Sequence, residues 1–183
     1  MSTRIQAEPT PNPHNMKFII SDRTISDESI EFDNPDSTDR SPLATKLFGF
    51  PWVSRVLIGP NFVSVQKQDW VDWDVLVEPL SGLIQEHIDD GYAVLVDRQA
   101  NEESKNLEDA ETQTIRRVLE QEVRPAVQTD GGDISFAKYE NNVVYIHMKG
   151  ACSGCPSSSY TLKMGIEARL KEVVPSIREV VAL

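Results

Sequence analysis

A chain of 183 residues is long enough for one or two domains with hydrophobic cores of their own. Its net charge of −11 repels phosphate backbones and anionic lipid headgroups, which argues against nucleic-acid or membrane partners. No stretch approaches the roughly 20 apolar residues of a membrane-spanning helix, and 2 cysteines are too few for a disulfide-stapled secreted scaffold. Residues 1–13 are polar, with no apolar signal region and no targeting peptide, so we expect a cytoplasmic chain that is either bacterial-like or a processed form.

The first half of the chain alternates short β-rich runs with helical patterns, which predicts a small mixed domain over residues 1–97. Strands are expected at residues 16–20, 29–32, 53–58 and 62–66, the last two as a hairpin. A short helix is expected at residues 43–48, and a longer amphipathic helix at residues 73–90 that stops at Gly91.

The second half predicts a compact domain over residues 107–183, after an acidic linker at residues 98–106 that lacks large apolar side chains. Its elements are expected in the order helix, strand, strand, helix, strand. The first helix is expected to end near Pro125, and the later elements to cover residues 134–139, 143–148, a helix after Pro156, and 177–183. The fold class is therefore α+β, with two small domains.

Several polar or small residues have a functional and a structural interpretation. Asp130 and Asp133 are candidates for acid–base chemistry, but the two glycines between them favour a turn. His87 lies beside the apolar stripe of its helix, which predicts a surface or boundary position, and His147 is expected to pack or to lie at the surface. Gly165 is costly inside a helix and predicts a close backbone approach.

The two cysteines, Cys152 and Cys155, form a Cys-x-x-Cys pair whose thiolates can converge on one metal centre. The pair follows a predicted strand and precedes a helix that starts at Pro156, so the positive end of the helix dipole favours thiolates and an anionic cluster. Neither thiol is expected to be needed in a core.

A cluster bound only by cysteine takes four thiolates, twice the number in this chain, which predicts a symmetric homodimer that shares one cluster. This count fits a [4Fe-4S] and a [2Fe-2S] cluster equally, so both stay open at this point.

Two other functions can use the same cysteine pair. A dithiol–disulfide oxidoreductase needs a Cys-x-x-Cys at a helix start. The expected strand–strand–helix order and the absence of tryptophan beside the pair argue against it. A structural zinc site shared by two chains would use the same four thiolates, and the sequence does not separate it chemically from a cluster.

The segment GACSGCPSSSYTLKMGIE, residues 150–167, resembles the signature of the NifU-like C-terminal domain of Nfu proteins. The first half is similar to the Nfu N-terminal domain at residues 10–13, 17–18, 41–44 and 47–48. The resemblance implies a non-enzymatic scaffold or carrier that receives a [4Fe-4S] cluster from an upstream assembly scaffold and transfers it to apo-proteins. It also implies cluster ligands at Cys152 and Cys155, and an N-terminal domain with a role in client recognition.

Overall fold

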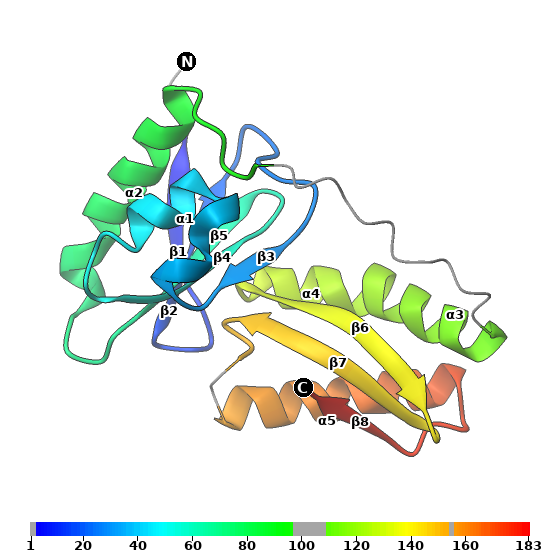
Figure 1. Cartoon of the computed structure of the whole chain (residues 1–183). Coiled ribbons are helices and arrows are strands. Elements are labelled where there is room, and N and C mark those ends of the chain that lie inside the picture. The colour runs from blue at the N-terminus through cyan, green and yellow to red at the C-terminus, as the bar shows by residue number, and fades with distance from the viewer. Residues whose placement is uncertain (1–2, 97–108, 154–155) are drawn as a thin grey trace. The chain divides into compact units, whose positions relative to one another are not determined.

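The computed structural model describes residues 3–96, 109–153 and 156–183, with only the backbone at residues 156–159 (Figure 1). Each of the three ranges contains both helices and strands. Across these ranges, no helix combines the length and the apolar character needed to cross a bilayer.

The chain divides into two compact units, Met1–Gln99 and Ala100–Leu183. The predicted linker at residues 98–106 lies outside the described residues. The domain limits at residues 97 and 107 also lie outside them and stay predictions. The α+β class is confirmed in both units, because each one combines a sheet with helices.

The N-terminal unit is built on a five-stranded antiparallel sheet in the order β1-β2-β5-β4-β3. The strands are β1 (Ile5–Pro9), β2 (Asn15–Ile20), β3 (Ile30–Phe32), β4 (Val53–Ile58) and β5 (Phe62–Lys67). The four later strands agree with their predicted positions to within one residue. Strand β1 is additional, because an edge strand buries little of itself and shows only a weak apolar pattern.

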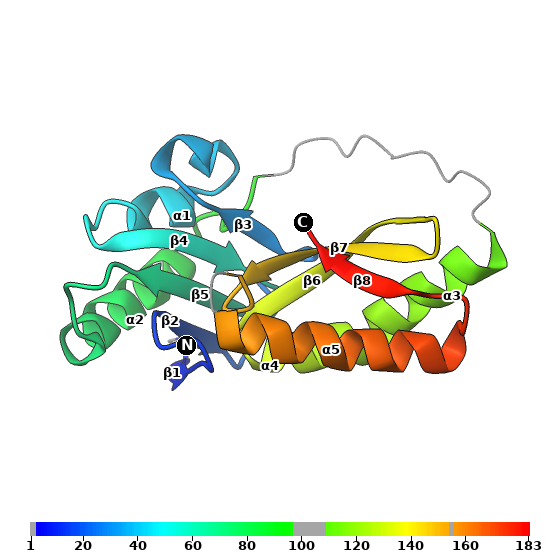
Figure 2. The same cartoon turned by 90° about the horizontal axis from the view of Figure 1, so that it is seen from below.

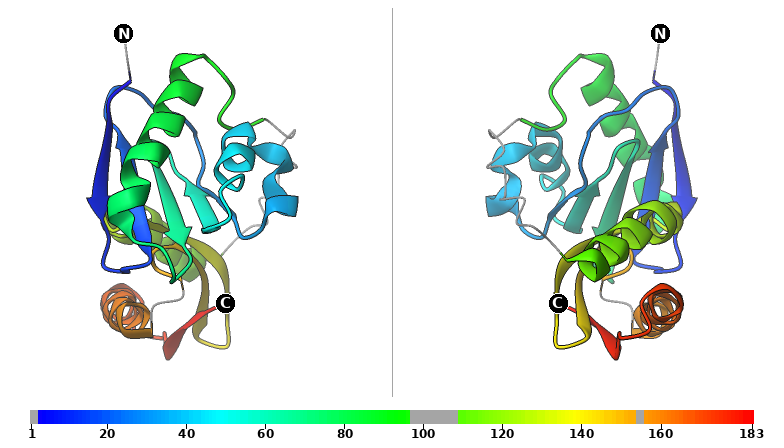
Figure 3. Two further views of the ribbon diagram at one scale, coloured as in Figure 1. Left: turned by 90° about the vertical axis from the view of Figure 1, so that its left-hand side faces the viewer. Right: turned by 90° about the vertical axis from the view of Figure 1, so that its right-hand side faces the viewer.

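Helices cover one face of this sheet. They are a 3₁₀ helix (Pro35–Arg40), α1 (Pro42–Leu47) and α2 (Trp73–Asp89). Figure 3 shows α2 lying over one face of the sheet. Leu76, Leu80 and Ile84 of this helix belong to the core of the unit. Both predicted helices are confirmed, and Gly91, at φ +76°, ends α2 as expected.

His87 is fully buried, which contradicts the predicted surface or boundary position. The chain that follows α2 folds back over its last turn, so that Nε2 of His87 lies 3.0 Å from the carbonyl oxygen of Ala93. The ring of Tyr92 lies 5.6 Å from the imidazole, centroid to centroid. Burial lowers the pKa of His87 by more than the hydrogen bond to Ala93 raises it, and Lys46 adds to the lowering, which favours the neutral imidazole.

The buried His87 makes the stability of the N-terminal unit depend on pH. Its folded-state pKa lies below the unfolded value, so its contribution is complete above the unfolded pKa and is lost as pH falls toward the folded pKa. We expect the free energy of unfolding to fall between about pH 7 and pH 5.5, by at most about 1.4 kcal/mol per pH unit. Urea denaturation followed by tryptophan fluorescence measures it. His87→Gln should flatten the dependence of the free energy of unfolding on pH, and His147→Gln, which changes an exposed histidine, should leave it unchanged. Equal pH dependence in His87→Gln and in the unaltered chain would contradict the role given to His87.

The C-terminal unit has a three-stranded sheet in the order β6-β7-β8. Its elements are α3 (Ala110–Val118), a π-helical turn (Leu119–Val123), α4 (Arg124–Thr129), β6 (Gly132–Glu140), β7 (Val143–Gly150), α5 (Pro156–Val173) and β8 (Glu179–Ala182). The predicted helix–strand–strand–helix–strand order is confirmed. Ile115, Ile146 and Ile166 lie in one core between the helices and the sheet. His147 is exposed, which agrees with the surface position that was one of its two predicted positions.

Pro125 does not end the first helix of this unit, contrary to the prediction. The preceding turn is π-helical, and the backbone N–H of Arg124 donates to the carbonyl of Leu119, five residues earlier. A wider turn makes room for the proline ring and for its missing N–H. The helical segment therefore continues through α4 to Thr129, and the turn sets the position from which Arg124 reaches the sheet.

Candidate metal centre

The cysteine pair lies where β7 ends and α5 begins. Gly150, at φ +64°, turns the chain out of β7, and the backbone N–H and Oγ of Ser153 donate to its carbonyl oxygen at 3.0 and 2.9 Å. Helix α5 begins at Pro156, as predicted, and the chain returns as β8, parallel to β7 (Figure 2). The pair therefore lies between the carboxyl end of a strand and the amino end of a helix, a common place for anionic ligands.

The parallel pairing of β7 with β8 corrects one argument used against an oxidoreductase. The order around the cysteines is strand–helix–strand with parallel strands, from Val143 opposite Glu179 to Ile146 opposite Ala182. The local topology thus resembles the context in which redox Cys-x-x-Cys motifs occur. The distinction between the two functions must come from the cysteines themselves.

Cys152 is buried in the core of the C-terminal unit and only 6% exposed, which contradicts the expectation that neither thiol is needed there. Its side chain lies against the backbone of Gly132, the first residue of β6. A Cβ atom at that position would overlap Sγ of Cys152 and would lie 2.9 Å from the carbonyl oxygen of Lys149. Gly132 therefore provides the space for the thiol, a role that its place in a predicted turn did not reveal.

The electrostatic surroundings of Cys152 favour the thiol over the thiolate. Burial raises the pKa of Cys152 to about 12, and the carboxylates of Asp130 and Asp133 add to the effect. The predicted thiolate at a helix start is thus wrong for this residue in the cluster-free chain. A role for Cys152 as a metal ligand would require the loss of this proton, because a metal binds the thiolate.

The second cysteine, Cys155, lies outside the described residues, as does Gly154. Its part in the site stays a prediction from the motif spacing. The position of the motif is nevertheless bounded on both sides, because Ser153 and the backbone of Pro156 are described.

An ion pair holds the turn beside Cys152. Arg124 donates from Nε and a terminal nitrogen to the two carboxylate oxygens of Asp133, at 2.8 and 2.9 Å. Asp133 is only 1% exposed, and these hydrogen bonds raise the pKa of Arg124. The turn predicted at Asp130–Asp133 is confirmed, with Gly131 at φ +75°, and the pair ties α4 to β6 where Gly132 contacts the thiol. Asp133 is therefore structural, and not one of two open carboxylates.

The solvent side of α5 carries apolar and small residues directly after the cysteine loop. Tyr160 is 66% exposed and Met164 is 48% exposed. Gly165 and Ala168 are also exposed, and no described atom outside the helix would lie within 4 Å of a Cβ at Gly165. The close approach predicted at Gly165 is therefore not found among the described residues. These four residues, the α5 face, follow helical spacing over successive turns.

Two families match the chain. Residues 115–181 match the family described as "NifU-like domain", and residues 5–91 match "Scaffold protein Nfu/NifU N terminal". Both matches lie within the units found by structure and together account for most of the chain.

The similarity to curated proteins extends over most of this chain. "NifU-like protein 5, mitochondrial" of Arabidopsis thaliana is 38% identical over 182 residues, with 96% of this chain and 66% of that protein covered. "NFU1 iron-sulfur cluster scaffold homolog, mitochondrial" of Homo sapiens is 34% identical over 178 residues, covering 96% and 70%. The chain spans just under two thirds of the Arabidopsis relative. Since both domains match in one chain, the protein belongs to the Nfu family.

Proposed function

We propose that this chain is an iron–sulfur cluster scaffold and carrier that binds a [4Fe-4S] cluster and passes it to apo-proteins. The observation that supports the proposal is the Cys-x-x-Cys pair between β7 and the amino end of α5. Thiolates there would be stabilised by helix-terminal N–H groups once iron replaces their protons. The human relative's name describes an iron–sulfur cluster scaffold, which agrees with this reading. In this proposal the chain catalyses no reaction, and its cytoplasmic location stays a prediction.

In this proposal, two copies share one cluster through Cys152 and Cys155 of each. Two thiolates per chain supply half of the four ligands that an all-cysteine cluster takes. The exposed Tyr160 and Met164 support a contact between copies, because apolar side chains gain by leaving water and lie directly after the cysteine loop. A cluster between subunits is also accessible to an acceptor, whose thiolates can replace those of the carrier pair by pair.

Anaerobic reconstitution with iron and sulfide tests the proposal. We expect about two irons and two sulfides per chain, visible absorbance, and a dimer by light scattering, which together correspond to one shared [4Fe-4S] cluster. About one iron and one sulfide per chain in a dimer would indicate a [2Fe-2S] cluster instead. The loaded dimer should then activate an apo-enzyme that needs a [4Fe-4S] cluster.

The same preparation separates the two other functions. A colourless protein that binds about half a zinc ion per chain would support a shared structural zinc site. Turnover of the dithiol with a reductase would support an oxidoreductase. Against the latter stands the burial of Cys152, since a redox-active first cysteine needs an exposed, acidic thiol.

The α5 face gives a direct test of the shared cluster. A carboxylate introduced at Ala168 would have to be desolvated between two copies, so we expect Ala168→Glu to give a monomer with at least about tenfold less iron bound. Ala126→Glu is the matched control, because Ala126 is also an exposed alanine on a helix of the same unit. Light scattering and iron analysis measure both. A cluster-loaded Ala168→Glu dimer would mean that the copies meet elsewhere.

A further inference from the structure

The tryptophans of the N-terminal unit gather near one end of its sheet. All 3 tryptophans of the chain lie between positions 52 and 73. Trp52 stacks on Phe50 with ring centroids 4.7 Å apart, and Trp73 is half-buried against the core. Trp70 differs from both, because it is 69% exposed. Few tryptophan side chains are exposed to this extent, and those that are often lie on surfaces that contact other molecules.

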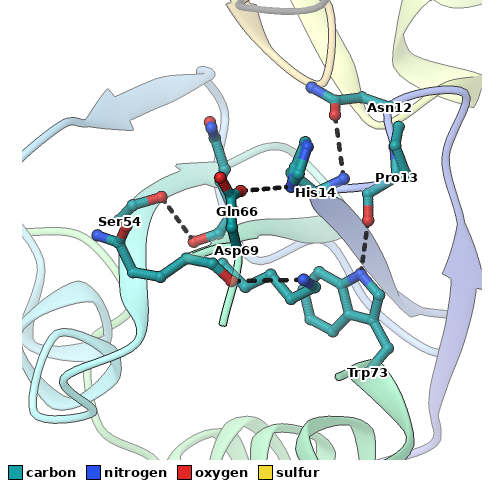
Figure 4. Close-up of polar contacts among 9 residues, drawn as sticks. Asn12, Pro13, His14, Ser54, Gln66, Asp69 and Trp73 are labelled. Atoms are coloured by element: carbon teal, nitrogen blue, oxygen red, sulfur yellow. Dashed lines mark hydrogen bonds and ion pairs between the residues drawn. The ribbon is translucent and has the colours of Figure 1, made fainter. Parts of the chain in front are cut away.

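The loop that carries Trp70, residues 68–72, is fixed at both ends. The backbone N–H of Gln68 donates to the carbonyl of Trp52 at 2.8 Å. Nδ1 of His14 lies 3.1 Å from a carboxylate oxygen of Asp69, and Nε1 of Trp73 donates to the carbonyl of Pro13 at 2.9 Å (Figure 4). A loop held in this way presents Trp70 without the ordering cost that a flexible loop would add on binding.

The loop that carries Trp70 and the first turns of α2 are acidic. Residues 68–78 contain four carboxylates, at Asp69, Asp72, Asp74 and Glu78, and no basic residue. All four side chains are exposed, and so is Val75, at 63%. An indole face beside carboxylates matches a cationic side chain, which gains from the ring quadrupole and from the charge.

The half-buried Trp73 already shows this type of contact within the chain. Nζ of Lys67 lies over its ring, 5.9 Å from the centroid. Trp70 lies on the loop that directly precedes Trp73 and α2, and its indole is open to solvent.

We propose that the surface formed by Trp70, Val75 and the carboxylates of residues 68–78, here called the acidic–aromatic surface, binds a partner-protein segment in which Arg or Lys alternates with apolar side chains. Trp70 would be the anchor, and the carboxylates would attract the basic residues and reject acidic segments.

A second copy of the chain is a poor occupant of this surface. The chain carries a net charge of −11, and its residues up to Arg98 hold 16 acidic against 8 basic side chains. Two such surfaces repel each other, whereas a basic segment is attracted at a rate that falls with salt. The inference concerns a different surface from the cysteine site and does not depend on cluster binding.

Fluorescence anisotropy with defined peptides tests the inference on the full chain. The probe is a labelled peptide of repeated Arg-Leu-Ser triplets, compared with Glu-Leu-Ser and Arg-Ser-Ser peptides of the same length. We expect the Arg-Leu-Ser peptide to bind at least about tenfold more tightly than either. Trp70→Ala should weaken its binding about tenfold or more, and Asp72→Asn with Asp74→Asn should weaken it roughly threefold and reduce its salt dependence.

Matched variants guard against general effects. Tyr92→Ala removes another exposed aromatic ring of the same unit, and Asp27→Asn with Asp39→Asn removes two exposed carboxylates elsewhere in it. Both should bind the probe as the unaltered chain does. The inference is overturned if Trp70→Ala binds equally well, if the Glu-Leu-Ser peptide binds as tightly, or if Trp70→Ala instead abolishes self-association of the chain. Cysteine variants that hold no cluster should bind the probe normally.

Discussion

Replacing Cys152 or Cys155 with serine is expected to abolish cluster binding, with iron and sulfide per chain falling to background after anaerobic reconstitution. A hydroxyl group does not replace a thiolate as a ligand, and a site that loses one residue loses two of its four ligands in a symmetric dimer. The fold should survive in both variants. Because Cys152 is buried in the core, Cys152→Ser should lower the free energy of unfolding by about 1–2 kcal/mol, as expected for a buried hydroxyl.

Ser153→Ala is the control for this experiment, since it alters the same loop without removing a predicted ligand. It loses the hydrogen bond from Oγ to the carbonyl of Gly150 and should still load a full cluster. Circular dichroism confirms the fold of each variant. A full cluster in either cysteine variant would show that the ligands have been assigned to the wrong residues.

Substituting Gly132 by alanine is expected to expose the Cys152 thiol and to destabilise the C-terminal unit. The new methyl group would overlap Sγ of Cys152 and lie too close to the carbonyl oxygen of Lys149. The side chain can rotate away, but the backbone oxygen can move only if β6 and β7 separate at this end. We expect a loss of about 1–3 kcal/mol in the free energy of unfolding, and a faster reaction of the cluster-free chain with a thiol reagent.

Gly165→Ala is the matched control, because none of the residues that the structure describes outside the helix lies within 4 Å of the added methyl group. Within a helix this change should stabilise the unit by about 0.5–1 kcal/mol. Thiol reactivity and urea denaturation measure both variants. If Gly132→Ala were as stable as the unaltered chain and its thiol reacted no faster, Gly132 would not be what keeps Cys152 in place.

The sequence predicts the elements well where one face of a strand or helix is regularly apolar. The predictions of the β4–β5 hairpin and of helix α2 are confirmed for this reason. The predicted start of α5 is confirmed as well, because proline is favoured at the first position of a helix. The predicted helix end at Pro125 is wrong, because a proline interrupts an α-helix but can follow a wider π-helical turn. Whether such a turn forms depends on tertiary packing.

From the sequence, only the two cysteines of the candidate site could be predicted, and not the residues that surround them. The spacing of Cys152 and Cys155 indicates metal chemistry, but it does not reveal that the first thiol is packed against Gly132. Nor does it reveal that Arg124, nine residues before Asp133, pairs with it. The burial of His87 is hidden in the same way, because the chain that covers it has no regular pattern. Such contacts depend on how separate elements meet, and a periodic pattern reports only one element at a time.

The buried position of Cys152 has a consequence for the chemistry of damage. Peroxides oxidise exposed thiolates first, to sulfenic acid and then to forms that are not readily reversed. A thiol that is both shielded from solvent and held in its protonated form reacts slowly with them. In the proposed carrier, Cys152 would therefore stay reduced while the site is empty, and would be open to oxidation chiefly during loading and unloading.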